Sequence, residues 1–242
     1  MALVPKITHC HFLRRPIGQI VCTAGLKNIK KPPNYDHIVM PERPRLKFVD
    51  KVPTFIYNHK TPRTTKRLDL LRGPEEIHNY LIHKQYGLVA LSGGRMNYRH
   101  FETIRFAMMR KLDVKKMFAV WRVDPPWLPV TKKGLGSRMG GGKGSIDHYV
   151  TPVKTGRIII EVGGKCSYEE VLPYLRSCAS KMPFKCMPCN EDILREMKEK
   201  EEREARDNIN PYTFEYMIKN NIGNCRQWIS THVDYKYFGK YL

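Results

Sequence analysis

The sequence predicts an α+β fold in which an antiparallel or mixed sheet is covered by two helices, with an extended arm before it and a helical extension after it. Short apolar segments bounded by glycine and proline predict the strands, and two segments of helical periodicity predict the helices. Apolar residues make up 41% of the 242 residues, enough for one core with extensions or for two small domains. No apolar run reaches the roughly 18 residues of a membrane-spanning helix, so membrane insertion is excluded.

The core domain is expected over residues 87–190 and contains five predicted strands. Each is a short segment rich in apolar residues that ends near glycine or proline. The strands are expected at 88–91, 117–123, 145–153, 156–162 and 184–187. Only a short connection through Lys154 and Thr155 separates the third strand from the fourth, which predicts a hairpin.

Two helices are expected to cover this sheet. Asn97 is expected to cap the first helix, and Ser167 with Glu170 forms a capping box for the second. Pro173 must either bend the second helix or lie in its first turn. The apolar stripe of the first helix consists of Phe101, Ile104, Met108 and Leu112. The opposite, basic side of that helix carries Arg99, Phe106 and Arg110.

Residues 1–31 have the composition of a mitochondrial targeting segment. They contain basic residues but no aspartate or glutamate, and the first acidic residue of the chain is Asp36. A basic RNA-binding arm would have a similar composition, so that alternative stays open. Residues 32–86 include six prolines between positions 32 and 62, which interrupt helix formation and predict an extended, surface-hugging arm.

Residues 191–242 are expected to form a helical and aromatic extension. Acid-first pairs four residues apart predict an exposed spacer helix, namely Glu191/Arg195, Glu196/Lys200, Glu199/Arg203 and Glu202/Arg206. Pro211 is expected at the first position of a short helix that ends near Gly223. The aromatic and basic tail over 228–242 is expected to dock against RNA or a neighbouring protein, with packing back onto the core as the alternative.

The cysteines give no sign of a disulfide framework or a metal site. Their number, seven, is odd, and they are widely scattered. Cys186 and Cys189 form a lone CxxC, but a zinc site needs four ligands and no second pair accompanies them. Ordinary thiols at the end of a strand are therefore expected, and no metal or cofactor is predicted.

Positive charge is concentrated around one glycine-rich segment. The formal net charge is +20, and residues 94–157 alone hold 14 lysines and arginines against four acidic residues. Within 132–144, glycines alternate with Lys132, Lys133, Arg138 and Lys143. Glycine permits close approach of the backbone to a phosphate, and the cations neutralise it. The segment predicts a phosphate-rich partner such as nucleic acid, and a flexible basic linker is the alternative.

Enzymatic interpretations of this region fail. A P-loop needs glycine six residues before Lys143, where serine stands, and a hydroxyl residue after it, where Gly144 stands. Met139 occupies the position of the third glycine of a dinucleotide-binding fingerprint. Asp147 and His148 are neighbours on a predicted strand, so they should point to opposite faces and form no acid–base pair. The protein is not expected to be an enzyme.

An ordered series of motifs runs through about 100 of the 242 residues. It begins with Gly-Gly-Arg at 93–95, the helix from Asn97 and Trp-Arg-Val at 121–123. It continues with Pro-Val-Thr-Lys-Lys at 129–133, Arg-Met-Gly-Gly-Gly-Lys-Gly at 138–144 and Lys-Met-Pro-Phe-Lys at 181–185. This series resembles the bacterial-type ribosomal protein L-sixteen family, which is related to the archaeal and cytosolic L-ten-e proteins.

The resemblance implies a hammerhead-like fold that sits on large-subunit rRNA near the base of the central protuberance, with the glycine-rich loop toward the A-site tRNA. The family usually has a lysine where Gly141 stands, and some bacterial members modify the residue matching Arg138. Arg138 and Lys143 are expected to make the deepest RNA contacts. The other expected RNA-binding residues are Arg95, Arg99, Arg110, Arg122, Lys132, Lys133, Gly140, Gly142 and Lys154.

The expected function is that of a structural constituent of the large subunit of the mitochondrial ribosome, located in the matrix. Its N- and C-terminal extensions are expected to contact neighbouring ribosomal proteins. The alternative is a free-standing RNA-binding regulator of mitochondrial translation. A ribosomal component should sediment with large subunits, whereas a regulator should not.

Overall fold

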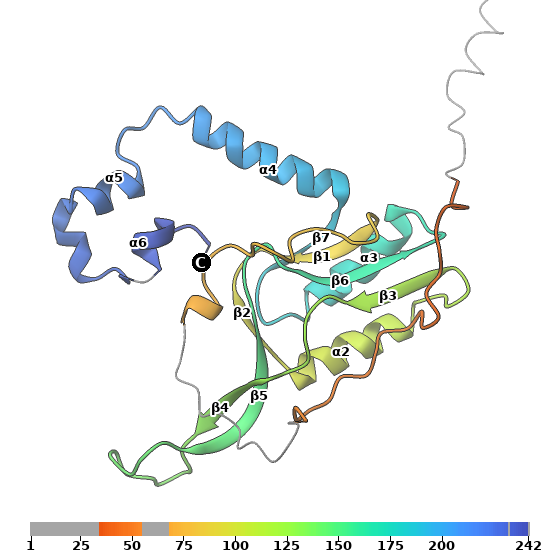
Figure 1. Ribbon diagram of the computed structural model, residues 1–242, viewed down its shortest axis with the longest axis horizontal. Coiled ribbons are helices and arrows are strands. Elements are labelled where there is room, and N and C mark those ends of the chain that lie inside the picture. The colour runs from red at the N-terminus through yellow and green to blue at the C-terminus, as the bar shows by residue number, and fades with distance from the viewer. Residues whose placement is uncertain (1–33, 55–67, 232, 242) are drawn as a thin grey trace, which may run out of the picture. The chain divides into compact units, whose positions relative to one another are not determined.

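A computed structural model of the protein describes residues 34–54, 68–231 and 233–241, so the predicted targeting segment lies outside the described residues. The chain forms two units, Met1–His37 and Ile38–Leu242. Of the first, the described part is the turn at residues 34–37, in which the Asp36 N–H donates to Asn34 Oδ1 at 3.0 Å. All described helices and strands belong to the second unit (Figure 1).

The larger of two antiparallel sheets has four strands in the order β3-β6-β1-β7. They span Tyr86–Ala90 (β1), Met117–Trp121 (β3), Ile158–Gly164 (β6) and Cys186–Asn190 (β7). All seven residues of β6 are buried, because strands flank it and apolar clusters cover both faces. The expected α+β class is confirmed, and the strands expected at 88–91, 117–123, 156–162 and 184–187 are found within a few residues of their predicted bounds.

The second sheet has three strands in the order β2-β5-β4. They span Gly94–Asn97 (β2), Leu128–Lys132 (β4) and Ser145–Val153 (β5). β2 and β4 were not expected, because β2 is short and polar and β4 contains Pro129. Proline is tolerated in β4 because that strand lies at the edge of its sheet.

The predicted hairpin between residues 145–153 and 156–162 is wrong. β5 pairs with β2 and β4, whereas the following strand, β6, pairs with β1 and β3 of the other sheet. Residues 154–157 therefore carry the chain from one sheet to the other. Gly156 has a φ of +87°, which glycine adopts readily and other residues rarely do.

Two helices pack against the larger sheet. α2 (Tyr98–Met109) is capped by Asn97 as expected, and the His100 side chain completes the capping box. α3 (Tyr168–Ala179) begins with the predicted box of Ser167 and Glu170. Pro173 is the sixth residue of α3, so it lies beyond the first turn and removes one hydrogen bond within the helix.

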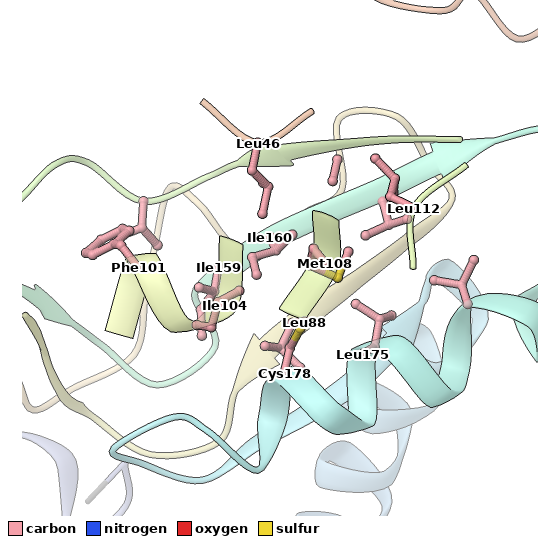
Figure 2. Close-up of a cluster of buried hydrophobic side chains, with 14 of the residues drawn as sticks. Leu46, Leu88, Phe101, Ile104, Met108, Leu112, Ile159, Ile160, Leu175 and Cys178 are labelled. Atoms are coloured by element: carbon pink, nitrogen blue, oxygen red, sulfur yellow. The ribbon is translucent and has the colours of Figure 1, made fainter. Parts of the chain in front are cut away.

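The core lies between these helices and the sheet. Figure 2 shows Leu88 of β1, Ile160 of β6, Ile104 of α2 and Leu175 of α3 in one cluster, and each is completely buried. A fully buried aliphatic side chain contributes about 1.5–3 kcal/mol relative to an exposed one. The apolar stripe predicted for the first helix therefore fixes α2 on the sheet.

The described part of the arm covers the free edge of β3. The Ala119 N–H donates to the Pro44 carbonyl at 2.8 Å, and Trp121 Nε1 donates to the Lys47 carbonyl at 3.0 Å. Leu46, between these two contacts, inserts into the core (Figure 2). A covered edge cannot pair with another chain, so the arm closes the sheet on that side.

The C-terminal extension consists of α4 (Glu191–Arg206), α5 (Phe214–Lys219), the 3-10 helix η2 (Ile222–Gln227) and α6 (Asp234–Tyr237). A short 3-10 helix, η1 (Leu68–Leu70), precedes β1. Ile193 and Leu194 of α4 pack against an apolar cluster beside β7, and every residue from 198 to 212 is exposed. Ile218, Cys225 and Ile229 form a separate small core with Phe238.

Three details of this extension differ from expectation. The four acid-first ion pairs are not formed on α4, where Lys200 Nζ instead lies 3.8 Å from Glu204. Exposed charges gain little from such pairing because water solvates them well. Thr213, rather than Pro211, is next to the start of α5 and caps it. The tail packs partly back on the chain, since Asp234 contacts Arg72 at 3.8 Å and the Tyr241 carbonyl accepts from the Gly73 N–H.

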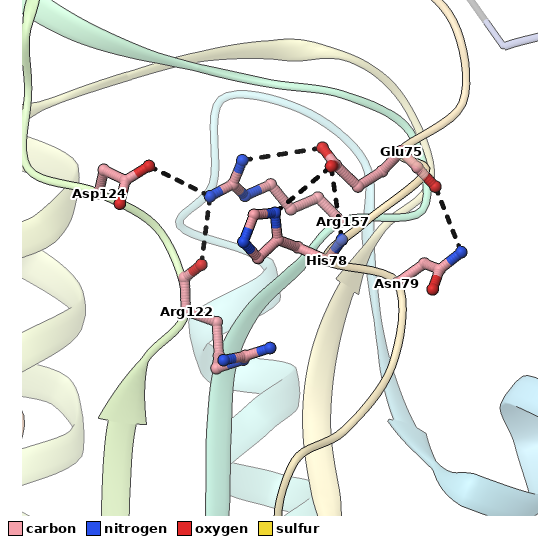
Figure 3. Close-up of polar contacts among 6 residues, drawn as sticks. All are labelled: Glu75, His78, Asn79, Arg122, Asp124 and Arg157. Atoms are coloured by element: carbon pink, nitrogen blue, oxygen red, sulfur yellow. Dashed lines mark hydrogen bonds and ion pairs between the residues drawn. The ribbon is translucent and has the colours of Figure 1, made fainter.

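Two arginines tie the segment before β1 to the sheet. Glu161 of β6 is 1% exposed, and it accepts from the Ile82 and His83 N–H groups while Arg122 Nε lies 3.0 Å from its Oε1. Arg157 contacts Glu75 at 3.7 Å and Asp124 at 3.4 Å (Figure 3). Figure 3 also shows His78 and Asn79 in contact with Glu75, which holds this segment in place.

We predict that Glu161→Gln destabilises the fold by about 3 kcal/mol, because it leaves the largely buried Arg122 charge without its anion. Urea unfolding followed by circular dichroism measures the change. The matched control is Glu204→Gln on α4, which removes the exposed partner of Lys200 and should change the stability by less than about 0.5 kcal/mol. Equal stability of the two variants would contradict the role assigned to Glu161.

Candidate nucleic-acid interface

The glycine-rich segment forms the loop at the far end of the β4–β5 hairpin (Figure 1). Strand pairing ends at Lys132 and Ser145, and every residue from 132 to 143 is exposed. Gly140 and Gly142 have φ values of +89° and +79°, and the Gly142 N–H donates to the Gly140 carbonyl. A tightly folded backbone of this kind presents N–H groups and flanking cations to an anion.

Lys132, Lys133, Arg138 and Lys143 all lie on this loop or at its base and are all exposed. Sequence reasoning missed that Leu135 and Met139 are also fully exposed at the tip. The available signal was the presence of large apolar residues outside any helical or strand periodicity. The loop therefore offers both cations and apolar contact area to a partner.

The remaining predicted cations fall into three places. Arg95 lies on β2 of the hairpin's own sheet, and Lys154 directly follows β5. Arg99 and Arg110 are exposed at opposite ends of α2, about 16 Å apart along its axis at 1.5 Å per residue. Arg122 is separate from all of these, since its side chain is 14% exposed and pairs with Glu161. Its guanidinium serves the fold, and an RNA contact from Arg122 stays a prediction.

The expectation that Asp147 and His148 point apart is wrong. His148 Nδ1 lies 2.8 Å from Asp147 Oδ2. The pairing register shifts between Val130 and Thr131, whose partners are His148 and Ile146, so Asp147 is the extra residue of a β-bulge. A bulge re-aims a side chain. The hydrogen bond from His148 and the nearby Lys132 charge lower the pKa of Asp147.

The five cysteines within the described residues are buried or partly buried free thiols. Burial raises the pKa of Cys186 and Cys189 to about 12, so both thiols are protonated at neutral pH. Cys186 packs against the main core and Cys189 belongs to the cluster beside α4. Within the described ranges, no three His, Cys, Asp or Glu side chains gather in a way that could hold a metal ion. No helix among the described residues is long and apolar enough to span a bilayer.

Comparison with known proteins places these features in a family context. Residues 57–188 match the family model described as ribosomal protein L16p/L10e. The large ribosomal subunit protein uL16 of Sulfurihydrogenibium sp. (strain YO3AOP1) is 39% identical over 114 residues, which cover 47% of this chain and 80% of that protein. The uL16 protein of Borreliella burgdorferi (strain ZS7) is 38% identical over 123 residues, which cover 50% and 86%.

We predict that replacing Arg138 and Lys143 by alanine weakens binding to folded RNA without changing the melting temperature, because both side chains are exposed. The affinity falls as salt rises, and the loss of two phosphate contacts should make the slope of log affinity against log salt concentration less negative by about 1.5. Filter binding at several salt concentrations measures this slope. The control variant, Lys198→Ala with Arg206→Ala on α4, loses the same charge and should keep the wild-type slope. An equal change of slope in both variants would contradict the role assigned to the loop.

Proposed function

Because the chain belongs to the ribosomal protein L16p/L10e family, we propose that its basic hairpin binds large-subunit rRNA near the central protuberance, with the loop directed toward the A-site tRNA. Membership of this family confirms the expectation of a structural, non-enzymatic component of the large ribosomal subunit. The rRNA and tRNA contacts are the proposed part.

The observation that carries this proposal is the exposed loop of 132–143, which projects four cations from a two-stranded support. Of the 14 lysines and arginines in 94–157, Arg105, Arg122 and Arg157 pair with carboxylates of the chain itself. The four loop cations are exposed on the surface. Folded RNA offers mainly shape and phosphates, and glycine-supported cations suit such a surface.

A mitochondrial location is proposed from the parts of the chain outside the family match. Residues 1–56 and 189–242 lie beyond the matched segment, and the relatives named above are bacterial. The acid-free composition of residues 1–31 is that of a matrix-targeting segment. We assign 32–86 to the arm, 87–190 to the rRNA-binding core and 191–242 to the extension.

The extension is proposed to bind a neighbouring ribosomal protein. α4 carries seven acidic and five basic residues in a chain of net charge +20. Its net negative charge is repelled by RNA phosphates, and its residues from 198 to 206 are exposed. A basic protein segment complements this helix better than rRNA does.

Cross-linking from two positions tests both surfaces at once. A photoreactive amino acid at Leu135 on the loop should form adducts with rRNA, because this side chain is fully exposed beside Arg138. The same group at Glu202, on the exposed part of α4, should form adducts with protein. Nuclease and protease treatment of the purified adducts distinguishes the two, and rRNA adducts from Glu202 would refute the assignment of α4.

Sedimentation tests the function as a whole. In a sucrose gradient of a mitochondrial lysate, the protein should travel with monosomes in magnesium and with free large subunits after EDTA treatment separates the subunits. The free-standing regulator, as the alternative, should stay at the top of the gradient under both conditions. That outcome, with intact subunits elsewhere in the gradient, would overturn the ribosomal role in mitochondria.

A further inference from the structure

The exposed side of α2 holds an aromatic stack that the charge-based interpretation left unexplained. The guanidinium carbon of Arg105 lies 4.1 Å from the centre of the Phe48 ring and 4.6 Å from that of Phe106. Phe48 comes from the arm and Phe106 from α2, so the stack joins two segments. Yet Phe48 is 63% exposed and Phe106 is 53% exposed. If the two rings served only to pack the arm against α2, more of their surface would be buried.

Arg105 is fixed in this position by its own helix. Its Nε and Nη2 donate to the two carboxylate oxygens of Glu102 at 3.0 and 2.8 Å, and Nη1 lies 3.2 Å from Met109 Sδ. A two-point contact with a carboxylate sets the plane of the guanidinium and neutralises its charge. Arg105 therefore stiffens the two rings and is not itself directed at a phosphate.

The surroundings of the stack are positively charged. Arg99 and Arg110 are exposed on the same side of α2 as Phe106, seven residues before it and four after it. On the arm, Phe48 lines a shallow pocket of about 500 Å³ whose charged walls are Arg43, Arg45 and Lys47 together with one acidic residue, Glu42. An exposed aromatic surface between cations complements a nucleic acid strand, which combines flat bases with phosphates.

We propose that the Phe48–Arg105–Phe106 stack is a platform on which an unpaired base of single-stranded rRNA lies, with Arg99 and Arg110 contacting the phosphates on either side. This inference deepens the proposed rRNA-binding role. It adds a second contact region on α2 and the arm, where recognition depends on the base rather than on charge alone. Splayed-out bases that stack on aromatic side chains are the usual mode of single-stranded RNA recognition.

The test compares two probes of equal charge, an octamer of adenosine ribonucleotides and an octamer of abasic ribose phosphates. The full-length wild-type protein should bind the adenosine octamer about 10-fold more tightly, because base–aromatic stacking is worth roughly 5- to 150-fold in affinity. Phe106→Leu should abolish this preference, and Phe106→Tyr should keep it. Fluorescence anisotropy measures the affinities, and circular dichroism checks that each variant is folded.

Two controls distinguish binding at the platform from binding at the glycine-rich loop and from nonspecific binding to exposed aromatic rings. The loop variant with Arg138 and Lys143 replaced by alanine should bind both octamers more weakly and retain the preference. Tyr212→Leu, which removes an exposed aromatic ring from the C-terminal extension, should change nothing. Equal affinity of the wild type for both octamers, or an unchanged preference in Phe106→Leu, overturns the platform. Sedimentation of the protein with large subunits is a separate outcome, so the two proposals can fail independently.

Discussion

Arg157 holds together the place where the chain passes between the two sheets. It lies on the connection from β5 to β6. Its guanidinium contacts Asp124, on the connection from β3 to β4, and Glu75, on the segment before β1 (Figure 3). The ion pair with Glu75 should contribute more to stability than the one with Asp124. The side chains of Arg157 and Glu75 are both largely buried, whereas that of Asp124 is mostly exposed to water. Because Arg157 contacts both connections between the two sheets, we expect it to help set the orientation of β4 and β5 and thereby the position of the basic loop.

The arginines of this chain therefore have two roles that the sequence alone does not separate. Arg122 and Arg138 both appeared as RNA contacts because each lies in a basic, motif-rich segment. Their surroundings differ: Arg122 neutralises the buried Glu161, while Arg138 is exposed. Glu161 is far from Arg122 in sequence, and the two meet only because β3 pairs with β6. Burying an unpaired carboxylate is costly, so the pairing of strands determines which arginine stays available to a partner.

The helix caps and the apolar stripe, which are set by neighbouring residues, were predicted well, whereas the ion pairs on α4 and the features set by distant residues were not. The caps at Asn97 and Ser167 and the apolar stripe of α2 depend on spacings of three or four residues, which the sequence displays directly. The hairpin predicted at residues 145–162 does not form, because β6 pairs with the distant strands β1 and β3 and is buried in the sheet that they make. The contact between Asp147 and His148 arises from a bulge whose position depends on the register with β4. The platform on α2 was missed for the same reason, since Phe48 reaches Arg105 only in the folded chain.

The distribution of charge also explains how an acidic helix can accompany a basic rRNA-binding domain. The core segment 94–157 carries ten more positive than negative charges, whereas α4 carries two more negative than positive. A phosphate surface attracts the first and repels the second, so electrostatics favours the proposed binding of RNA by the hairpin and disfavours binding of RNA by α4. Contacts near β7 fix only the first two turns of that helix, through Ile193 and Leu194. The rest of α4 is an exposed helix, and a basic protein neighbour is the partner that its charge and its exposure both favour.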